Sequence, residues 1–456
     1  LVNLVLHAVA SAGVAILAYR LTGRSAAAWI AGTLFAAHPL HTESVATGYG
    51  RAELLAGVFG VWLLARHVRT GGDEPPRRAR FYFFSALLYL AAVMSKEHAL
   101  FLWPAVLLID VWPRRSRSAP GADELNGAAP KPGLIQRWRR AINESLGPRH
   151  VGYALATAVF FLLRFRLFKW AYVVEPERVR FWEAPMRHAT PIQHLLTPFR
   201  LLWTTAELLV YPPRLCPLWS IPALPLADRL APDVLAGIAI LIVLLVLTLR
   251  CWRRGHLEGA LIMGMLIVLA IPLQALPVAN WYYAERWLYL PTVFMAVLLA
   301  AACGRLAGYL APVAAALAIG LLPATWSYCG AYRDILAMTG TTLQRQPDNY
   351  QGYRSRAPAL HAAGRYAEVA QLGLEMLERF GEIEDAYLTL AHAYLALGDG
   401  RSAHEALENY KRLRGPIPAF GTDALERQIQ ALIEAEQAQS PGSTAPASLP
   451  ADNPPH

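Results

Sequence analysis

The chain has 456 residues, of which 55% are hydrophobic and 16% charged, and its formal net charge is +9. The mean hydropathy of +0.30 is too high for a soluble protein of ordinary composition. Basic residues exceed acidic ones in residues 1–330, where they lie in short joints between apolar stretches, whereas acidic residues prevail from Ala331 onward. This pattern is typical of a membrane protein oriented by its loop charges and argues against a nucleic-acid-binding surface.

Ten apolar stretches predict a polytopic, all-α membrane bundle in residues 1–326. A helix needs ~20 residues to span a bilayer, and several of these stretches are shorter. We expect their outer ends to be buried in protein, where irregular backbone is tolerated. The predicted crossings are 1–19, 26–41, 52–65, 81–95, 98–112, 151–168, 233–250, 259–279, 287–303 and 307–326.

The polar joints between the stretches are of two kinds, which alternate along the chain. One kind is rich in arginine and belongs on the cytoplasmic side by the positive-inside rule: 20–24, 66–80, 114–149, 250–254 and Arg305. The other kind combines His, Glu, Arg and Lys and is therefore expected on the outer face. Helix 1–19 then runs from outside to inside, so we expect an upstream helix and an outer segment that this chain lacks. Only four of the 42 basic residues are lysines, which indicates a high-GC bacterial protein of the inner membrane.

A long outer loop, 169–232, is predicted between the sixth and seventh crossings. Helix 151–168 ends outside and helix 233–250 begins outside, so Pro198–Tyr211 cannot be a single crossing. We predict an interfacial or re-entrant helix there. The many tryptophan and tyrosine residues of this loop are typical of a membrane interface.

Soluble helices with an internal repeat are predicted after residue 330. Three residue types recur at a spacing of 34 residues: Tyr353 and Tyr387, Ala357 and Ala391, Gly364 and Gly398. This spacing is the length of a tetratricopeptide repeat. Two repeats are fewer than a solenoid needs, so we expect helices 331–346 and 422–437 to cap them. The predicted repeat domain spans 331–437, and the Pro-, Ser- and Ala-rich tail 438–456 is expected to be disordered.

The first outer joint carries His38, His41 and Glu43 within six residues. Pro39 cannot continue a helix, so the crossing ends here and these side chains gather at the outer rim. Two imidazoles and a carboxylate can perform acid–base chemistry or bind a sugar, whereas their spacing differs from the i, i+4 histidine pair of a zinc helix. No metal site is expected, since the four cysteines also form no CxxC pair. The alternative is a polar helix end that faces solvent.

Two further outer joints carry cations suited to a phosphate. Arg51 and Glu53 begin a helix, where backbone N–H groups and a guanidinium together favour an anion. Lys96 and Glu97 form a tight turn, and Lys96 is the one lysine within the bundle, which favours a point charge for a lipid phosphate. The structural alternatives are an ion pair of Arg51 with Glu53 or Glu43, and a lysine that snorkels at a helix end.

The last outer joint places Glu285 and Arg286 between aromatic residues, with Tyr289 close behind. Charges at such a helix start are costly near lipid unless they are paired. The aromatic faces beside them are surfaces on which sugar rings stack. The alternative is a buried Glu285–Arg286 pair that only holds helices together.

These joints, in this order, resemble the transmembrane-and-tetratricopeptide O-mannosyltransferase family, of the GT-C class of glycosyltransferases. The matching pieces are 1–8, 38–46, 50–56, 95–97 and 284–291, followed by the repeats. The resemblance implies a GT-C-like membrane domain over 1–326 and an enzyme that transfers a hexose, typically mannose, from a polyprenyl-phosphate carrier. The acceptor it implies is a Ser/Thr hydroxyl on the periplasmic or luminal side, where the repeats also lie. The resemblance also implies an acidic catalytic residue in the first outer loop, which we expect upstream of residue 1.

The resemblance divides the candidate residues by expected role. The catalytic candidates are Glu43, His41 and Glu285; those for the donor phosphate are Arg51, Lys96 and Arg286; those for acceptor or sugar contacts are His38, Glu53, Glu97 and Tyr289. The implied partners are the lipid bilayer, the polyprenyl-phosphate sugar as donor substrate, and an acceptor protein or peptide held by the repeat helices, with no further cofactor. Two alternatives remain: a non-catalytic membrane-anchored scaffold of an envelope complex, and a lipid-linked polysaccharide ligase or polymerase.

The alternation of the joints predicts that the repeats lie on the same side of the membrane as Glu43 and Glu285. Reporter fusions placed after Leu322 and after Leu360 should therefore both show a periplasmic signal, because the two crossings 287–303 and 307–326 return the chain to the side of the last outer joint and Leu322 lies near the outer end of the second crossing. A fusion within 114–149 provides the cytoplasmic control. A cytoplasmic signal from either of the first two fusions would overturn this orientation.

Overall fold

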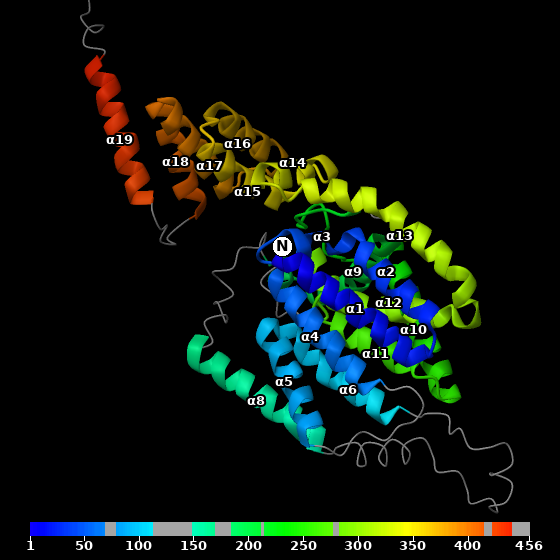
Figure 1. The fold of residues 1–456 in the computed structure, drawn as a ribbon. Coiled ribbons are helices and arrows are strands. Elements are labelled where there is room, and N and C mark those ends of the chain that lie inside the picture. Colours follow the sequence, from blue (N-terminus) through cyan, green and yellow to red (C-terminus); the bar gives the residue numbers. More distant parts are fainter. Residues whose placement is uncertain are drawn as a thin grey trace, which may run out of the picture. The chain divides into compact units, whose positions relative to one another are not determined.

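The computed structural model describes residues 1–68, 79–112, 148–168, 184–210, 214–276, 282–414 and 422–439. Within these ranges it contains 18 α-helices, and its β-structure is confined to two isolated bridges (Figure 1). The all-helical fold expected from the sequence is therefore confirmed for the described residues. The chain divides into two compact units, Leu1–Asn349 and Tyr350–His456.

Five helical segments of the first unit are long and apolar enough to cross a membrane. They are Val2–Thr22, His150–Leu167, Pro232–Arg254, Glu285–Ala302 and Ala307–Tyr332. Three further apolar helical segments are shorter: Ser25–Ala37, Arg80–Ser95 and Glu258–Leu269. Several segments of this length and hydropathy indicate a multi-pass membrane protein.

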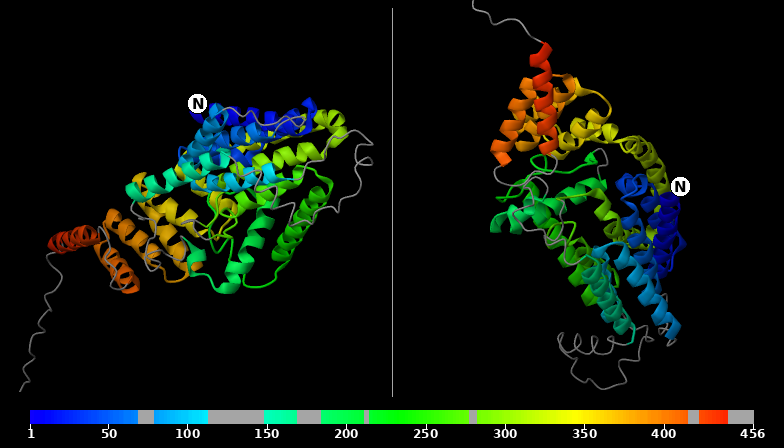
Figure 2. Two further views of the ribbon diagram at one scale, coloured as in Figure 1. Left: turned by 90° about the horizontal axis from the view of Figure 1, so that it is seen from below. Right: turned by 90° about the vertical axis from the view of Figure 1, so that its left-hand side faces the viewer.

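The helices of the first unit pack alongside one another (Figures 1 and 2). The α-helices are α1 Val2–Thr22, α2 Ser25–Ala37, α3 Thr42–Ala46, α4 Arg51–His67, α5 Ala79–Ser95, α6 Leu102–Val111, α8 Pro148–Phe168, α9 Pro191–Val210, α10 Pro232–Arg254, α11 Glu258–Leu269, α12 Tyr289–Ala302, α13 Ala307–Gly330 and α14 Ile335–Arg345. The main 3-10 turns are η1 Pro39–His41, η2 Glu97–Phe101 and η6 Glu285–Leu288. α1 contacts α2, α4 and α12, while α11 contacts α6, α10 and α12. These contacts bring helices distant in sequence into one bundle.

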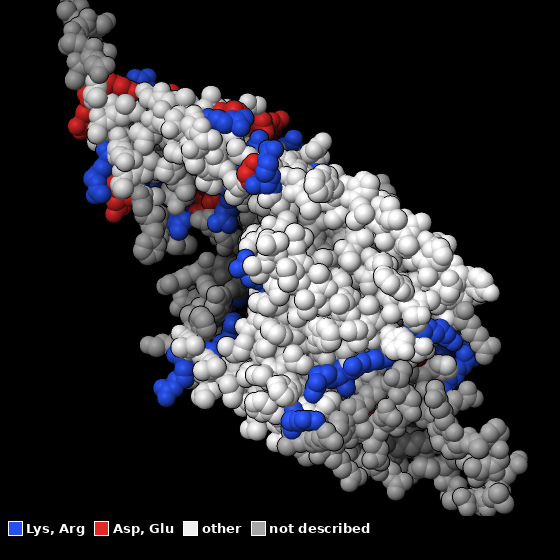
Figure 3. Space-filling view, viewed as in Figure 1, with Lys and Arg blue, Asp and Glu red and all other residues white. Residues whose placement is uncertain are grey.

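The bundle buries one large apolar core and leaves other apolar faces uncovered. Core residues from six different helices include Leu17, Phe35, Leu54, Tyr89, Leu102 and Phe294. α8, α10 and α13 instead carry exposed leucine, isoleucine and valine side chains. Figure 3 shows a broad surface almost without charged residues, with Lys and Arg grouped along its margin. Large uncharged faces of this kind suit contact with lipid.

Three of the predicted crossings are too long at one end. The predicted helix 26–41 stops at Ala37, because Pro39 ends the α-helix and begins η1. The predicted helix 98–112 is a 3-10 turn as far as Phe101, and only then continues as α6. The predicted helix 259–279 ends at Leu269, just before Pro272, and residues 270–276 form turns.

The helix of the long outer loop begins earlier than predicted. α9 starts at Pro191 and runs through Pro198 to Val210. A capping box formed by Thr190 and Gln193 marks the start of this helix. The Thr190 N–H donates to Gln193 Oε1 at 2.9 Å, and the Gln193 N–H donates to Thr190 Oγ1 at 3.4 Å. Proline at the first helical position strengthens this start.

The second unit is a row of paired helices. They are α15 Tyr350–Ala362, α16 Tyr366–Phe380, α17 Glu384–Leu397, α18 Gly400–Arg414 and α19 Thr422–Gln439. Each of these helices contacts the next one along the chain. α15 and α17 begin 34 residues apart, as do α16 and α18. Gly364 and Gly398, at the turns within the two pairs, have positive φ of 72° and 81°. Most of the tail 438–456 lies outside the described residues.

A close contact between α4 and α12 provides a test of the bundle packing. A Cβ atom at Gly57 would lie 2.4 Å from the Tyr289 ring, so Gly57→Ala should destabilise the protein by about 1–3 kcal/mol through overpacking. Gly320→Ala in α13, where no atom lies within 4 Å, is the matched control and should not lower the melting temperature. Thermal unfolding in detergent measures both variants. Equal melting temperatures for the two would contradict this packing.

Candidate active site

The first outer joint is folded inward rather than exposed. η1 places His41, which is 3% exposed, and α3 places Glu43, which is 1% exposed. The His38 ring receives the Leu40 N–H at Nδ1 and lies 3.0 Å from the Leu209 carbonyl oxygen at Nε2. A joint buried in this way differs from the solvent-facing helix end considered as the alternative.

Glu43 pairs with Arg286 across 243 residues of sequence. The Glu43 Oε2 atom accepts the Arg286 backbone N–H at 2.8 Å, and Oε1 forms an ion pair with the Arg286 guanidinium. Arg286 is the second residue of η6, and 20% of its side chain is exposed. Its guanidinium also lies over the Tyr49 ring, 5.0 Å from the centroid. A bidentate contact of this kind fixes the carboxylate and the guanidinium in one orientation.

The neighbouring Glu285 points to other partners. Its Oε1 atom accepts the Cys216 N–H at 2.6 Å and the Trp219 indole N–H at 3.1 Å, and Oε2 accepts the Tyr328 hydroxyl at 2.9 Å. Glu285 is fully buried. The Glu285–Arg286 pair considered as an alternative is therefore not what holds this joint together. Three donors from the 216–219 segment and α13 satisfy the Glu285 carboxyl instead.

Glu53 collects two basic groups from the turn at Lys96. The Lys96 ammonium lies 3.3 Å from Glu53 Oε1, and the His98 Nε2 atom lies 3.3 Å from Glu53 Oε2. Glu53 is 1% exposed, whereas Lys96 keeps 27% of its side chain exposed. Glu97, the first residue of η2, is exposed. Lys96 is thus anchored by a carboxylate but still open on one side.

Arg51 is held by an asparagine of α1. Its Nε–H donates to Asn3 Oδ1 at 3.0 Å, and the Asn3 amide donates to the Val45 and Thr47 carbonyl oxygens at 3.1 and 2.8 Å. Among the described residues, no ion pair of Arg51 with Glu53 or Glu43 is found. Asn3 was not among the predicted site residues, since a single amide in an apolar helix carries no motif.

His41 and Tyr289 lie in a buried ring cluster. The Nδ1 and Nε2 atoms of His41 lie 2.8 Å from the Phe35 carbonyl oxygen and 2.9 Å from the Thr292 hydroxyl. The Tyr289 hydroxyl lies 2.8 Å from His7 Nδ1. Both His41 nitrogens therefore have hydrogen-bond partners, which connect the first outer joint to α2 and α12.

Burial also affects the acid–base properties of the joint. Burial raises the pKa of the Glu43 carboxyl, although the Arg286 charge opposes this shift. Burial lowers the pKa of His41 well below its usual value, with further lowering from His7 and His38. Burial thus favours the protonated form of the Glu43 carboxyl and the neutral form of the His41 imidazole.

The structure brings several of the predicted residues into one charged cluster, whereas others face different elements. Glu53 lies close enough to Glu43 and Arg286 to interact electrostatically with both. Glu43, Arg286, Glu53 and Lys96 therefore form one charged cluster, with Arg51 on the adjoining turn. Glu285 faces the 216–219 segment, and His38 faces α9.

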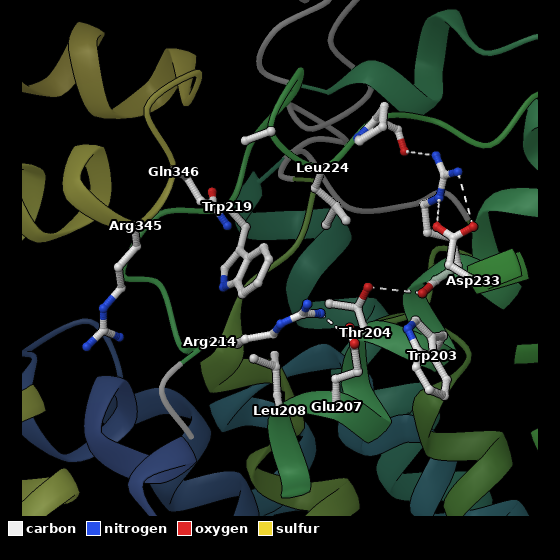
Figure 4. Close-up of a pocket in the computed structure, with 13 residues that line it drawn as sticks. Trp203, Thr204, Glu207, Leu208, Arg214, Trp219, Leu224, Asp233, Arg345 and Gln346 are labelled. Atoms are coloured by element: carbon white, nitrogen blue, oxygen red, sulfur yellow. Dashed lines mark hydrogen bonds and ion pairs between the residues drawn. The ribbon is translucent and has the colours of Figure 1, made fainter. Parts of the chain in front are cut away.

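A cavity of about 600 Å³ adjoins the Glu285 side of this region. Figure 4 shows the Trp219 and Trp203 indoles on separate walls of this cavity. The cavity also contains two ion pairs, Arg200–Asp233 at 2.6 Å and Arg214–Glu207 at 2.5 Å. Trp219 links it to the site, since its indole N–H donates to Glu285. Trp203 and Trp219 belong to the aromatic residues of the loop 169–232 that predict a membrane interface. Their separation in sequence does not reveal that they share a cavity.

The chain is similar to known proteins over part of its length. A mouse protein O-mannosyl-transferase, TMTC3, is 26% identical over 311 residues, which are 66% of this chain and 32% of that protein. The fruit-fly protein O-mannosyl-transferase Tmtc2 is 40% identical over 116 residues, 24% of this chain and 12% of the relative. Human TMTC1 is 25% identical over 308 residues, 62% of this chain and 33% of the relative. The chain is a distant homologue of the TMTC protein O-mannosyl-transferases.

This relationship covers only part of each protein. The chain spans about a third or less of the length of these curated relatives. No family model matches the chain, and no solved structure matches it. The resemblance inferred from the outer joints is thus confirmed as distant homology, which supports glycosyltransferase activity at the level of the related proteins.

The Glu43–Arg286 pair should dominate the stability of this region. Glu43→Gln and Arg286→Gln should each cost roughly 2–4 kcal/mol, because either change leaves a charge buried without its partner. The double variant should cost clearly less than the sum of the two single variants. Thermal unfolding of the four proteins measures this coupling. Arg333→Gln is the control. It breaks the ion pair of Arg333 with Asp334, whose side chains are 80% and 48% exposed, and should change the melting temperature little. Additive losses at positions 43 and 286 would argue against the pair.

Proposed function

We propose that this protein is a membrane glycosyltransferase. It transfers a hexose, mannose in the first instance, from a polyprenyl-phosphate carrier to a Ser/Thr hydroxyl of a protein. The distant homology supports this class of reaction. The single observation that carries the proposal is the cluster of Glu43, Arg286, Glu53 and Lys96, with Arg51 beside it.

The donor phosphate is bound by Arg286, Lys96 and Arg51. The exposed fractions of Arg286 and Lys96, 20% and 27%, leave room for an anion, and Arg51 is exposed. Their protein partners hold the cations in place before the substrate arrives. Cations oriented in advance stabilise the charge that develops on a leaving phosphate.

The acidic groups divide the remaining work. Glu43, whose pKa is raised by burial, is the candidate for proton transfer near the acceptor hydroxyl. Glu285 and His41 position the two joints, as their hydrogen bonds occupy the carboxylate and both ring nitrogens. His38, Glu53, Glu97 and Tyr289 remain candidates for acceptor or sugar contacts.

The cavity beside Trp219 is proposed to hold a sugar or the acceptor side chain. Its volume of about 600 Å³ lies in the range of small-molecule sites, roughly 300–1,000 Å³. Two indole faces and paired charged groups offer both apolar contact and hydrogen bonding. Glu285, reached through Trp219, couples the cavity to the charged cluster.

The architecture belongs to the same proposal. Ten crossings in residues 1–326 form a GT-C-like bundle in a bacterial inner membrane. Helices within 331–437 form tetratricopeptide repeats on the periplasmic side and hold the acceptor. The 34-residue spacing of the helix starts in the second unit supports the repeats. α14, at the position of the expected cap 331–346, groups with the first unit, and the helices from Tyr350 onward form the second.

Loss of a phosphate contact should affect turnover far more than folding. Arg51→Ala and Lys96→Ala should each lower transfer on the order of 10²–10³-fold, because these contacts count mainly in the transition state. The measurement is release of polyprenyl phosphate by purified protein in liposomes, with and without an acceptor peptide. Membrane insertion should stay close to that of the wild type, and Lys96→Ala should lower the melting temperature more than Arg51→Ala, because it removes an ion pair of the buried Glu53.

Arg24→Ala provides the matched control, since Arg24 is an exposed arginine of a predicted cytoplasmic joint. It should release polyprenyl phosphate at the wild-type rate. Wild-type release by the double variant Arg51→Ala/Lys96→Ala would sink the phosphate assignment. Absence of both release and transfer from the unchanged protein would favour the scaffold alternative.

A further inference from the structure

A second cavity, of about 520 Å³, lies away from the candidate active site. It is lined by α10, α11 and α12 near the carboxyl ends of α10 and α12. α11 packs against both of the other helices. α10 and α12 both lie in segments with the length and hydropathy of membrane spans. The cavity therefore lies between helical segments of membrane-spanning type.

Most of the cavity wall is apolar. Its lining side chains are largely leucine, isoleucine, methionine and alanine, including Ile262 of α11, Met295 and Leu299 of α12 and Leu247 of α10. Leu247 and Leu299 remain 42% and 49% exposed. Flexible methionine and leucine side chains adapt to a chain of methylene groups. A small hydrated anion gains nothing from such a wall.

The charged residues of the cavity are predominantly basic. Arg250 and Arg254 lie one turn apart on α10, and both line the cavity. Both are exposed, and within the described ranges neither has a hydrogen bond or ion pair to another side chain. His256 and Glu258 complete the polar part, 3.8 Å apart. The wall thus combines an apolar surface with two arginines in the last turns of a membrane-type helix.

We propose that this cavity binds one anionic phospholipid. An acyl chain lies against the apolar wall, and the headgroup phosphate contacts Arg250 and Arg254. The charge is complementary, and the arginines lie where a span reaches the headgroup region. Basic residues at that depth attract anionic lipids. The site is independent of glycosyl transfer and would exist in a scaffold as well.

The test compares two lipids with the same acyl chains and different headgroups. Purified protein in neutral detergent is titrated with dioleoyl phosphatidylglycerol or dioleoyl phosphatidylcholine, and bound lipid is counted by native mass spectrometry. The anionic lipid should bind more tightly. Arg250→Gln/Arg254→Gln should weaken it about 30-fold, or roughly fivefold for each arginine near a membrane surface, and should weaken the zwitterionic lipid much less, because its choline ammonium offsets the phosphate charge.

The matched control is Arg24→Gln/Arg253→Gln, which removes the same charge from exposed positions that do not line the cavity. It should retain wild-type affinity for the anionic lipid. Ala302→Trp, at an exposed lining position, should reduce binding of both lipids by filling the cavity. Inorganic phosphate at millimolar concentration should not compete.

Three results would overturn the proposal. Equal losses in the two arginine pairs would indicate general surface charge. Unchanged lipid binding by Ala302→Trp, with its fold verified by melting temperature, would exclude the cavity. Competition by inorganic phosphate would indicate a free-anion site without an acyl chain.

Discussion

The ion pair between Glu43 and Arg286 is the constraint on which the candidate site depends. A carboxylate that is 1% exposed cannot remain ionised at low cost without a cation. Arg286 supplies the cation through its guanidinium and adds its backbone N–H at 2.8 Å. The two residues belong to α3 and η6, so one interaction connects the beginning of the bundle with its last outer joint. The positions of the neighbouring side chains follow from this connection.

Two adjacent residues of η6 contact different parts of the bundle. Arg286 faces Glu43, while the residue before it, Glu285, faces Cys216, Trp219 and Tyr328. Two acidic groups are thereby placed near each other but supplied by different donors. Glu43 has a guanidinium partner, and Glu285 has neutral N–H and O–H donors. Glu43 is therefore held by an ion pair, whereas Glu285 connects Trp219 of the cavity wall to Tyr328 of α13 through hydrogen bonds.

The same principle recurs around Glu53. A buried carboxylate holds Lys96 on one oxygen and approaches His98 on the other. Acidic side chains below the surface thus orient cations that remain partly accessible. Under the proposed function, an incoming phosphate would meet charges whose positions have already been set, so that little reorganisation would be needed.

The sequence by itself determined the helical class, the membrane character and the positions at which polar joints interrupt the apolar stretches. Hydropathy and proline depend on local chemistry, so these features follow from a few adjacent residues. The pairings were not predictable in this way. Arg286 was expected beside Glu285 or a phosphate, but it pairs with Glu43, and Arg51 is held by Asn3. Only tertiary structure decided these partners, because the energy of a buried charge depends on which group packing brings within hydrogen-bond distance, however far apart the two residues lie in the chain.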